Sequence, residues 1–224
     1  MRSASIGTAA LLTGALLAAT PAAAYADYSP SDFPSTADVS DAIGRGGSWE
    51  RYLGKTYRSG DWVVGARPAQ CASDRAYATV THRRSAYYTK MRSSGSQLGY
   101  SAAVELYKFP SKARARAALK KVQAHVRSCP TYTEWVCTQC DGIFDVWQRI
   151  SPVPNAGDKT VAWAGRSMGN IGDRYRSAAV LDRDNIIKVS VSIFGDAGGS
   201  RFPSARPTKP EVRDLAAAAY NNLP

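Results

Sequence analysis

Alternating apolar and polar residues predict β-strands in the middle and late parts of the chain. In the clearest case, residues 187–193, four branched apolar side chains alternate with lysine and serine. Side chains of a strand point alternately to its two faces, so a slip of one residue would expose all four. The polar turn at residues 182–185 joins this strand to an apolar stretch at 175–181, which predicts a β-hairpin. Similar patterns predict strands within residues 100–107, 144–150 and 161–164.

Apolar residues at helical spacing predict three helices. Ser111 is placed to cap a helix at 112–127, whose apolar stripe recurs every three or four residues at Ala115, Leu119, Val122, Val126 and Cys129. The sequence Thr208-Lys209-Pro210-Glu211 combines a capping box with a proline in the first helical turn, and apolar residues follow it. A short helix is expected to begin after Ser35 or Thr36 and to end at Gly44. Strands with helices inserted between them and at the end favour an α+β domain with an antiparallel sheet.

The first 26 residues have the features of a secretory signal peptide. Arg2 supplies a positive charge, residues 6–18 form an uncharged run rich in alanine and leucine, and Ala24-Tyr25-Ala26 forms a cleavage site before Asp27. The run is shorter than the ~20 apolar residues that a spanning helix needs. We therefore expect a secreted, extracellular protein without a stable membrane anchor. Residues 27–36, rich in Pro, Ser and Asp, are expected to be flexible, and residues 37–224 to form one domain.

Four cysteines in an exported chain predict disulfides, because the compartment is oxidising. A bridge between Cys71 and Cys129 would close a long loop and stabilise the fold by ~4 kcal/mol. Cys137 and Cys140 form Cys-Thr-Gln-Cys, which allows three interpretations. A short structural disulfide is the simplest. A redox-active pair usually has its first cysteine at the start of a helix, which lowers the pKa of that thiol. Here the pair lies in an expected loop at 130–142, with no predicted helix after it. Zinc would need both cysteines, Cys129 and a histidine.

Positive charge is concentrated in one part of the chain. The formal net charge is +11. Between residues 76 and 128 there are eleven basic residues and a single acidic one, Glu105. Lys112, Arg116 and Lys120 follow one side of the predicted helix. The candidate anion-binding face comprises Arg83, Arg84, Lys90, Arg92, Lys112, Arg116 and Lys120. Such a face attracts polyanions weakly, or is a solvated surface that maintains solubility. No base-reading motif accompanies it, so sequence-specific binding to nucleic acid is not expected.

The sequence shows no recognised catalytic constellation. His82 is followed by two arginines, which would oppose a protonated imidazole, and His125 lies on the amphipathic helix. The glutamates are far apart in sequence, and Glu211 has a capping role. We expect no enzyme activity, no cofactor and no metal. The rival interpretations are a secreted hydrolase with an unrecognised site and a surface protein that binds polyanions or the cell wall.

The order of these features resembles the extracellular sensor domain of PknH-type receptor serine/threonine kinases of actinobacteria, a domain that also occurs in secreted and lipoprotein forms. The resemblance covers nearly all of the chain after the leader. It is carried by the short helix at 36–44, the isolated Cys71, the strand-helix unit that starts at 103–111, Arg127-Ser128-Cys129, the late hairpin with 184–187 and the alanine-rich C-terminal helix.

The resemblance implies a twisted antiparallel β-sheet with helices that form a groove for an unidentified ligand, and no catalysis. It maps the family's first disulfide onto Cys71 and Cys129. The family's second disulfide normally links the strands of the late hairpin, which here contain no cysteine. A disulfide between Cys137 and Cys140 is therefore argued from their spacing alone. We thus expect a disulfide-stapled α+β domain with its helices packed on one face. Its expected role is a non-enzymatic, sensor-like module for a small-molecule or cell-envelope ligand.

Overall fold

The computed structural model describes residues 27–45, 48–63, 77–91, 98–137, 142–168, 172–195, 203 and 205–223. The predicted leader, Cys71, Arg92 and Cys140 lie outside these residues. Within them, no helix is long and apolar enough to cross a membrane.

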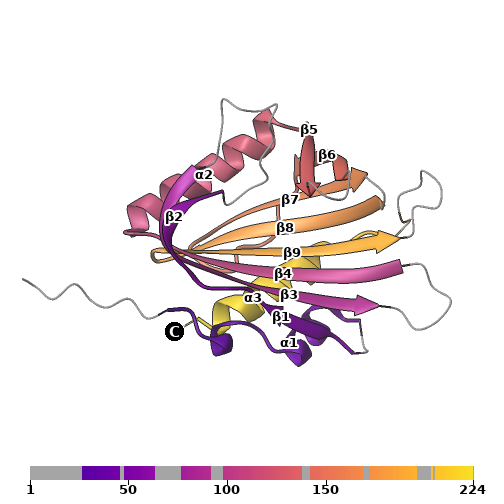
Figure 1. Cartoon of the computed structure of the whole chain (residues 1–224), viewed down its shortest axis with the longest axis horizontal. Coiled ribbons are helices and arrows are strands. Elements are labelled where there is room, and N and C mark those ends of the chain that lie inside the picture. The colour runs from indigo at the N-terminus through magenta and orange to yellow at the C-terminus, as the bar shows by residue number, and fades with distance from the viewer. Residues whose placement is uncertain are drawn as a thin grey trace, which may run out of the picture.

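One antiparallel β-sheet organises the described chain (Figure 1). Its strands are β1 (Glu50–Leu53), β2 (Tyr57–Val63), β3 (Tyr77–Met91), β4 (Leu98–Lys108), β5 (Thr131–Cys137), β6 (Gly142–Ile150), β7 (Lys159–Met168), β8 (Gly172–Asp182) and β9 (Asn185–Gly195). They lie in the order β1-β3-β4-β9-β8-β7-β6-β5, and β2 also pairs with β3. The predicted hairpin is β8–β9, and Ile187, Val189, Val191 and Ile193 are all buried as the alternation predicts.

The predicted helices are confirmed, with the expected caps. They are α1 (Thr36–Ile43), α2 (Lys112–Ser128) and α3 (Lys209–Asn221), and a short 3-10 helix, η1, spans Pro30–Asp32. Ser35 begins α1 and Gly44 ends it with a φ of 62°, a left-handed conformation that favours glycine. Ser111 caps α2, and the capping box of Thr208 and Glu211 begins α3.

The helices pack on both faces of the sheet, which corrects the expectation of one face. Figure 1 shows α1 and α3 on one side and α2 on the other. Ala178 and Val180 belong to the core under α1 and α3, whereas Ala179 and Leu181 belong to the core under α2. The uninterrupted apolar run 178–181 is typical of a strand that is buried on both faces. This run was the feature of the sequence from which helices on both faces of the sheet could have been predicted.

Residues 27–36 differ from the expected flexible segment, because they pack against the sheet. Tyr28 and Phe33 are buried in the α1/α3 core. The Tyr28 hydroxyl donates to Asn185 Oδ1 at 2.8 Å, and the Tyr88 hydroxyl donates to the Pro34 carbonyl at 2.7 Å. Two aromatic side chains therefore anchor a segment whose composition resembles that of a loop.

The cysteines are partly described. Cys129 is fully buried at the end of α2 and takes part in a disulfide. The described side chains do not include its partner, so the Cys71–Cys129 pairing stays a prediction. The expected loop at 130–142 is wrong, because β5 occupies its first half and pairs with β6. Cys137 is the last residue of β5, and the side chains of Cys137 and Cys140 lie outside the described part of the chain.

Candidate functional site

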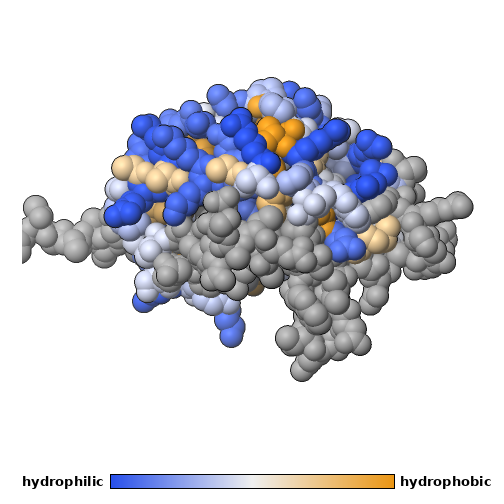
Figure 2. Space-filling model, turned by 90° about the horizontal axis from the view of Figure 1, so that it is seen from above, coloured by the Kyte–Doolittle hydropathy of each residue, from blue (hydrophilic) through white to orange (hydrophobic). Residues whose placement is uncertain are grey.

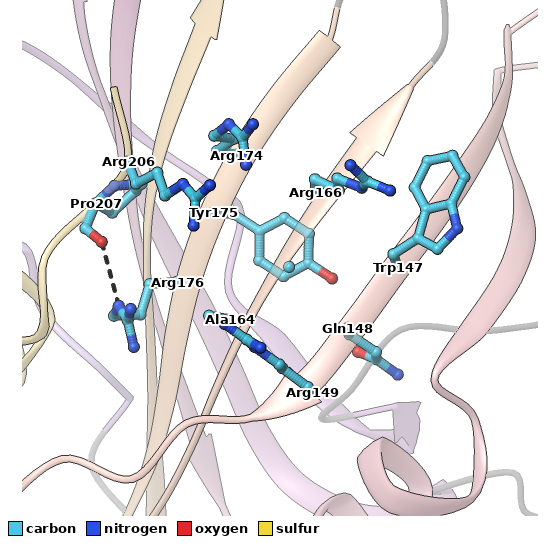
Figure 3. A pocket seen from close by; sticks show the side chains of 11 residues that line it. Trp147, Gln148, Arg149, Ala164, Arg166, Arg174, Tyr175, Arg176, Arg206 and Pro207 are labelled. Atoms are coloured by element: carbon cyan, nitrogen blue, oxygen red, sulfur yellow. Dashed lines mark hydrogen bonds between the residues drawn. The ribbon is translucent and has the colours of Figure 1, made fainter. Parts of the chain in front are cut away.

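A pocket of about 340 Å³ lies between β6, β7, β8 and the segment that leads into α3 (Figure 3). Its most prominent feature is arginine. The described lining residues are Trp147, Gln148, Arg149, Ala164, Gly165, Arg166, Arg174, Tyr175, Arg176, Arg206 and Pro207. Five of these eleven residues are arginines, and they come from three strands and one loop segment. We call this the arginine pocket.

The strand register explains why the arginines of β7 and β8 meet. Arg166 pairs with Arg174 across these strands, and Arg166 also faces Trp147 of β6. Residues directly opposite each other in a sheet share a face, so these side chains lie together. Arg174 is opposite Ile193, which belongs to the core under α1 and α3. The arginine pocket therefore lies on the α1/α3 face.

A second row of the same face brings in two further arginines. Ala164 of β7 lies between Arg149 of β6 and Arg176 of β8 in the register. The small alanine side chain leaves space between the two longer ones. Arg206 reaches the pocket from the segment before α3. Figure 3 shows Arg206 and Arg174 on one side of the pocket, Arg166 and Trp147 on the other, and Arg149 and Arg176 along its lower border.

Backbone carbonyls and one aromatic ring fix several of these guanidinium groups. Arg174 Nε donates to the Pro203 carbonyl at 2.6 Å, and Arg176 Nε donates to the Pro207 carbonyl at 3.2 Å. Arg176 Nη1 also donates to the Ser151 hydroxyl. The Arg166 guanidinium stacks on the Trp147 ring at 4.7 Å from the ring centre, a favourable cation–π contact. Two backbone carbonyls, one hydroxyl group and one aromatic ring thus help to hold these arginine side chains in place.

The described lining residues of the arginine pocket include no carboxylate. Asp173, next to Arg174 in sequence, points to the opposite face, where Ser167 N and Oγ donate to it at 2.9 and 2.5 Å. Glu211 lies near Arg176 but is bound by Arg45 at 2.9 Å. Asp145 is two residues before Trp147 on β6 and lies outside the lining. The charged side chains among the described lining residues are therefore all arginines.

The arginines raise one another's electrostatic energy. Burial, followed by repulsion from Arg206 and Arg166, lowers the pKa of Arg174. Burial and then Arg149 lower the pKa of Arg176, against a partial compensation by Glu211. Like charges opposite each other in a sheet are destabilising. A cluster of this kind costs stability in the unliganded protein, which is typical of functional sites.

The sequence placed seven basic residues in one anion-binding face. In the structure, those of β3 point to both faces of that strand, and the others that are described lie on α2. On β3, Arg83 lies 3.8 Å from Glu105 and 5.6 Å from the centre of the Tyr107 ring. Arg84 Nη1 donates to the Tyr28 carbonyl at 2.6 Å, and Lys90 Nζ donates to the Arg45 carbonyl at 3.0 Å. Adjacent strand residues point to opposite faces, so Arg83 and Arg84 do not lie on one face.

The α2 members of that face do lie together. Lys112 pairs with Asp158 at 2.6 Å, and Arg116 and Lys120 are exposed. Figure 2, which looks onto the side where α2 lies, shows a largely hydrophilic surface over the described residues. A hollow of about 460 Å³ lies between α2 and β3, bordered by Arg114 and Lys121 and by apolar side chains. It holds fewer cations than the arginine pocket, which makes it the weaker candidate.

Residues 165–169 have the spacing Gly-x-Ser-x-Gly that marks the nucleophile of many hydrolases. That motif needs a sharp turn from a strand into a helix. Here Ser167 lies within β7, and its hydroxyl donates to Asp173. His82 lies on β3 beside Asp27, and His125 is buried in α2. In the sheet, β4, β9 and β8 separate β3 from β7, so His82 and Ser167 are too far apart to form a base–nucleophile pair.

The arginine pocket was not predicted from the sequence. Its signal was present as Arg174-Tyr175-Arg176, since residues two apart on a strand share a face. Arg149 occurs in the strand predicted within residues 144–150, whereas Arg166 lies two residues beyond the strand predicted at 161–164. Only the pairing of β6, β7 and β8 shows that they converge. Charge counted along the sequence pointed instead to residues 76–128, where Arg83 and Arg84 point to opposite faces of β3.

No protein-family model matches the chain. No curated protein matches it either. Among solved structures, the chain is similar to the extracellular domain of PknH from Mycobacterium tuberculosis, with a TM-score of 0.54 and 14% identity over 86% of this chain and 93% of that one. An uncharacterised protein from Mycobacterium smegmatis gives a TM-score of 0.40 and 10% identity over 86% of this chain and 98% of that one. The chain has an α+β fold like that of the PknH extracellular domain.

Proposed function

We propose that this protein is an exported, non-enzymatic ligand-binding domain of the sensor type, and that the arginine pocket binds a small anionic ligand. The likeness in fold to an extracellular domain and the signal-peptide features of residues 1–26 support the location and the class. The observation that carries the proposal is the meeting of five arginines around one pocket whose described lining has no acid.

Arginine suits binding better than proton transfer. Its guanidinium stays protonated at any ordinary pH and offers five N–H donors in a rigid fork. A pocket of about 340 Å³ is within the range of small-molecule sites. Because Arg174 and Arg176 are already fixed by the Pro203 and Pro207 carbonyls, little side-chain freedom is lost when an anion binds.

Isothermal titration calorimetry with inorganic pyrophosphate tests this proposal. The variants Arg174→Gln and Arg166→Gln should each weaken binding at least about tenfold, since a charge-assisted pair contributes ~1.5–3 kcal/mol. Arg213→Gln is the matched control: it removes one positive charge from an exposed position of α3 that pairs with Asp214 at 2.6 Å. Binding by the control should change less than about twofold. Equal affinities in all four proteins would refute the proposal.

Binding of polyanions along α2 is a second candidate function. It is favoured by the exposed row of Lys112, Arg116 and Lys120, which lies away from the buried stripe of the helix. Such an open row would attract polymers by long-range charge without enclosing a ligand.

A further inference from the structure

We infer that the ligand of the arginine pocket presents a phosphate monoester or diphosphate group, with an organic part small enough to share the pocket. This inference rests on the proposed function and specifies its ligand. It follows from the charge of the pocket, from the directions of its donors and from its size.

The charge of the pocket favours a ligand group with at least two negative charges. Arg166 and Arg174 are direct cross-strand neighbours, so their side chains start only ~5 Å apart. Arg206 adds its charge to Arg174 from the segment before α3. A group with more than one negative charge can pair with more than one of these neighbouring guanidinium groups. A phosphate monoester carries nearly two charges at neutral pH, and a diphosphate carries more. The repulsion described above is therefore relieved best by a multiply charged group.

The directions of the donors favour a tetrahedral group over a planar one. Arg174 and Arg206 approach from one side of the pocket and Arg166 from the other, while Arg149 and Arg176 border it below (Figure 3). A carboxylate has two oxygens in one plane and can accept a bidentate arginine from few directions. A terminal phosphate has three oxygens that point in different directions, and each can accept from a separate guanidinium. Donors that come from several sides fit the second geometry.

The size and the remaining lining favour an attached organic part. A pocket of about 340 Å³ is larger than a bare phosphate group needs. Trp147, Ala164 and Pro207 contribute apolar surface next to the cations. Trp147 also holds Arg166 by stacking, so the aromatic side chain positions a cation and borders the organic part at once. The ligand class is thus a phosphorylated small molecule.

Competition among small anions of known charge and shape tests the ligand class. Phenyl phosphate, phthalate, methyl phenyl phosphate and phenyl sulfate would be titrated separately into the purified protein at one ionic strength. Phthalate has two charges on planar groups, whereas the diester and the sulfate ester have tetrahedral groups with one charge. Phenyl phosphate and pyrophosphate should bind at least about tenfold more tightly than these three, a difference of ~1.4 kcal/mol.

The outcomes separate this inference from the proposed function. Phthalate binding as tightly as phenyl phosphate would show a pocket selective for charge alone and would overturn the inference. A diester that matches the monoester would overturn it as well, in favour of a phosphate polymer. Failure of every anion, pyrophosphate included, would instead refute the proposed function.

A charge-conserving variant provides a second measurement. Arg166→Lys keeps the positive charge but replaces the planar fork by a single ammonium group. If the tetrahedral group is held by bidentate contacts, affinity for phenyl phosphate should fall about fivefold or more while affinity for phthalate changes less. An equal loss for both anions would contradict the geometric part of the inference. Because Arg166 is only partly buried, the variant should fold, and its melting temperature checks this.

Discussion

Gly165 shows how closely the strands behind the arginine pocket are packed. A Cβ atom at this position would lie 2.3 Å from the Trp147 carbonyl oxygen and 2.4 Å from the Tyr175 hydroxyl. The Tyr175 ring therefore covers the bare backbone of Gly165, its direct partner on β7. This contact lies on the face opposite Arg174 and Arg176, and it holds β7 and β8 in the register that brings the arginines together.

Replacing Gly165 with alanine should destabilise the protein by ~1–3 kcal/mol, because a carbonyl group of a neighbouring strand cannot move aside easily. Urea unfolding measures the change. Gly44→Ala is the comparison: nothing lies within 4 Å of its added Cβ, and only the left-handed φ opposes it, at ~1 kcal/mol. A Gly165→Ala variant as stable as the wild type would show that β7 and β8 are less tightly joined than described.

At the scale of elements, Glu105 links β3, β4 and β9 on the face away from α1 and α3. Lys188 Nζ lies 3.4 Å from its carboxylate, Arg83 lies 3.8 Å away, and the Tyr107 hydroxyl donates to it. Burial alone raises the pKa of Glu105, but attraction to Lys188, the hydrogen bond from Tyr107 and attraction to Arg83 together hold that pKa below its ordinary value. The ionised form thus favours the folded state.

This direction fixes the sign of a pH effect. A lowered pKa in the folded state gives stability that is present above the unfolded pKa and is lost as pH falls through the folded one. Glu105→Gln should therefore lower the melting temperature at pH 7, by the equivalent of ~1–3 kcal/mol. The gap to the wild type should narrow on acidification towards pH 3. Calorimetry over this range measures the gap, and a gap that widens with acid would contradict the account of Glu105.

For α2, we predict weak and salt-sensitive retention on a heparin column. Exposed basic side chains release counterions when they meet a polyanion, so affinity falls steeply with salt. Reversing the charge at Lys112, Arg116 and Lys120 should move elution to lower salt without unfolding the helix, since its buried stripe is untouched. Retention that is unchanged in the triple variant would show that the α2 row is only a solvated surface.

The elements were largely predictable from the sequence, whereas the site was not. Caps at Ser35, Ser111 and Thr208 and the alternation in β9 are local signals, and the structure confirms them. The arginine pocket depends on which strands are neighbours, and β6, β7 and β8 acquire their register through long-range pairing. The meeting of side chains from several strands leaves no local pattern in the sequence. It could therefore be recognised only once the pairing of these strands was known.

At the scale of the whole molecule, the predicted Cys71–Cys129 disulfide would tie the end of α2 to a distant part of the chain. The predicted Cys71–Cys129 bridge would close a much longer loop than a Cys137–Cys140 bridge. On the loop-entropy model the two contribute ~4 and ~2 kcal/mol. Replacing Cys71 and Cys129 with alanine should therefore lower the melting temperature more than replacing Cys137 and Cys140. Peptide mapping under non-reducing conditions reads the pairing directly, and a Cys129–Cys137 link would overturn it.

In the described part of the molecule, positive charge gathers in two places, the arginine pocket on the α1/α3 face and the exposed row along α2. The central claim is that the arginine pocket is the ligand site. Anomalous diffraction from a crystal grown with equimolar tungstate, a heavy tetrahedral dianion, tests this claim most directly. We predict the strongest peak between Arg166, Arg174 and Arg206. Peaks confined to the outer surface of α2, with none in the arginine pocket, would contradict it.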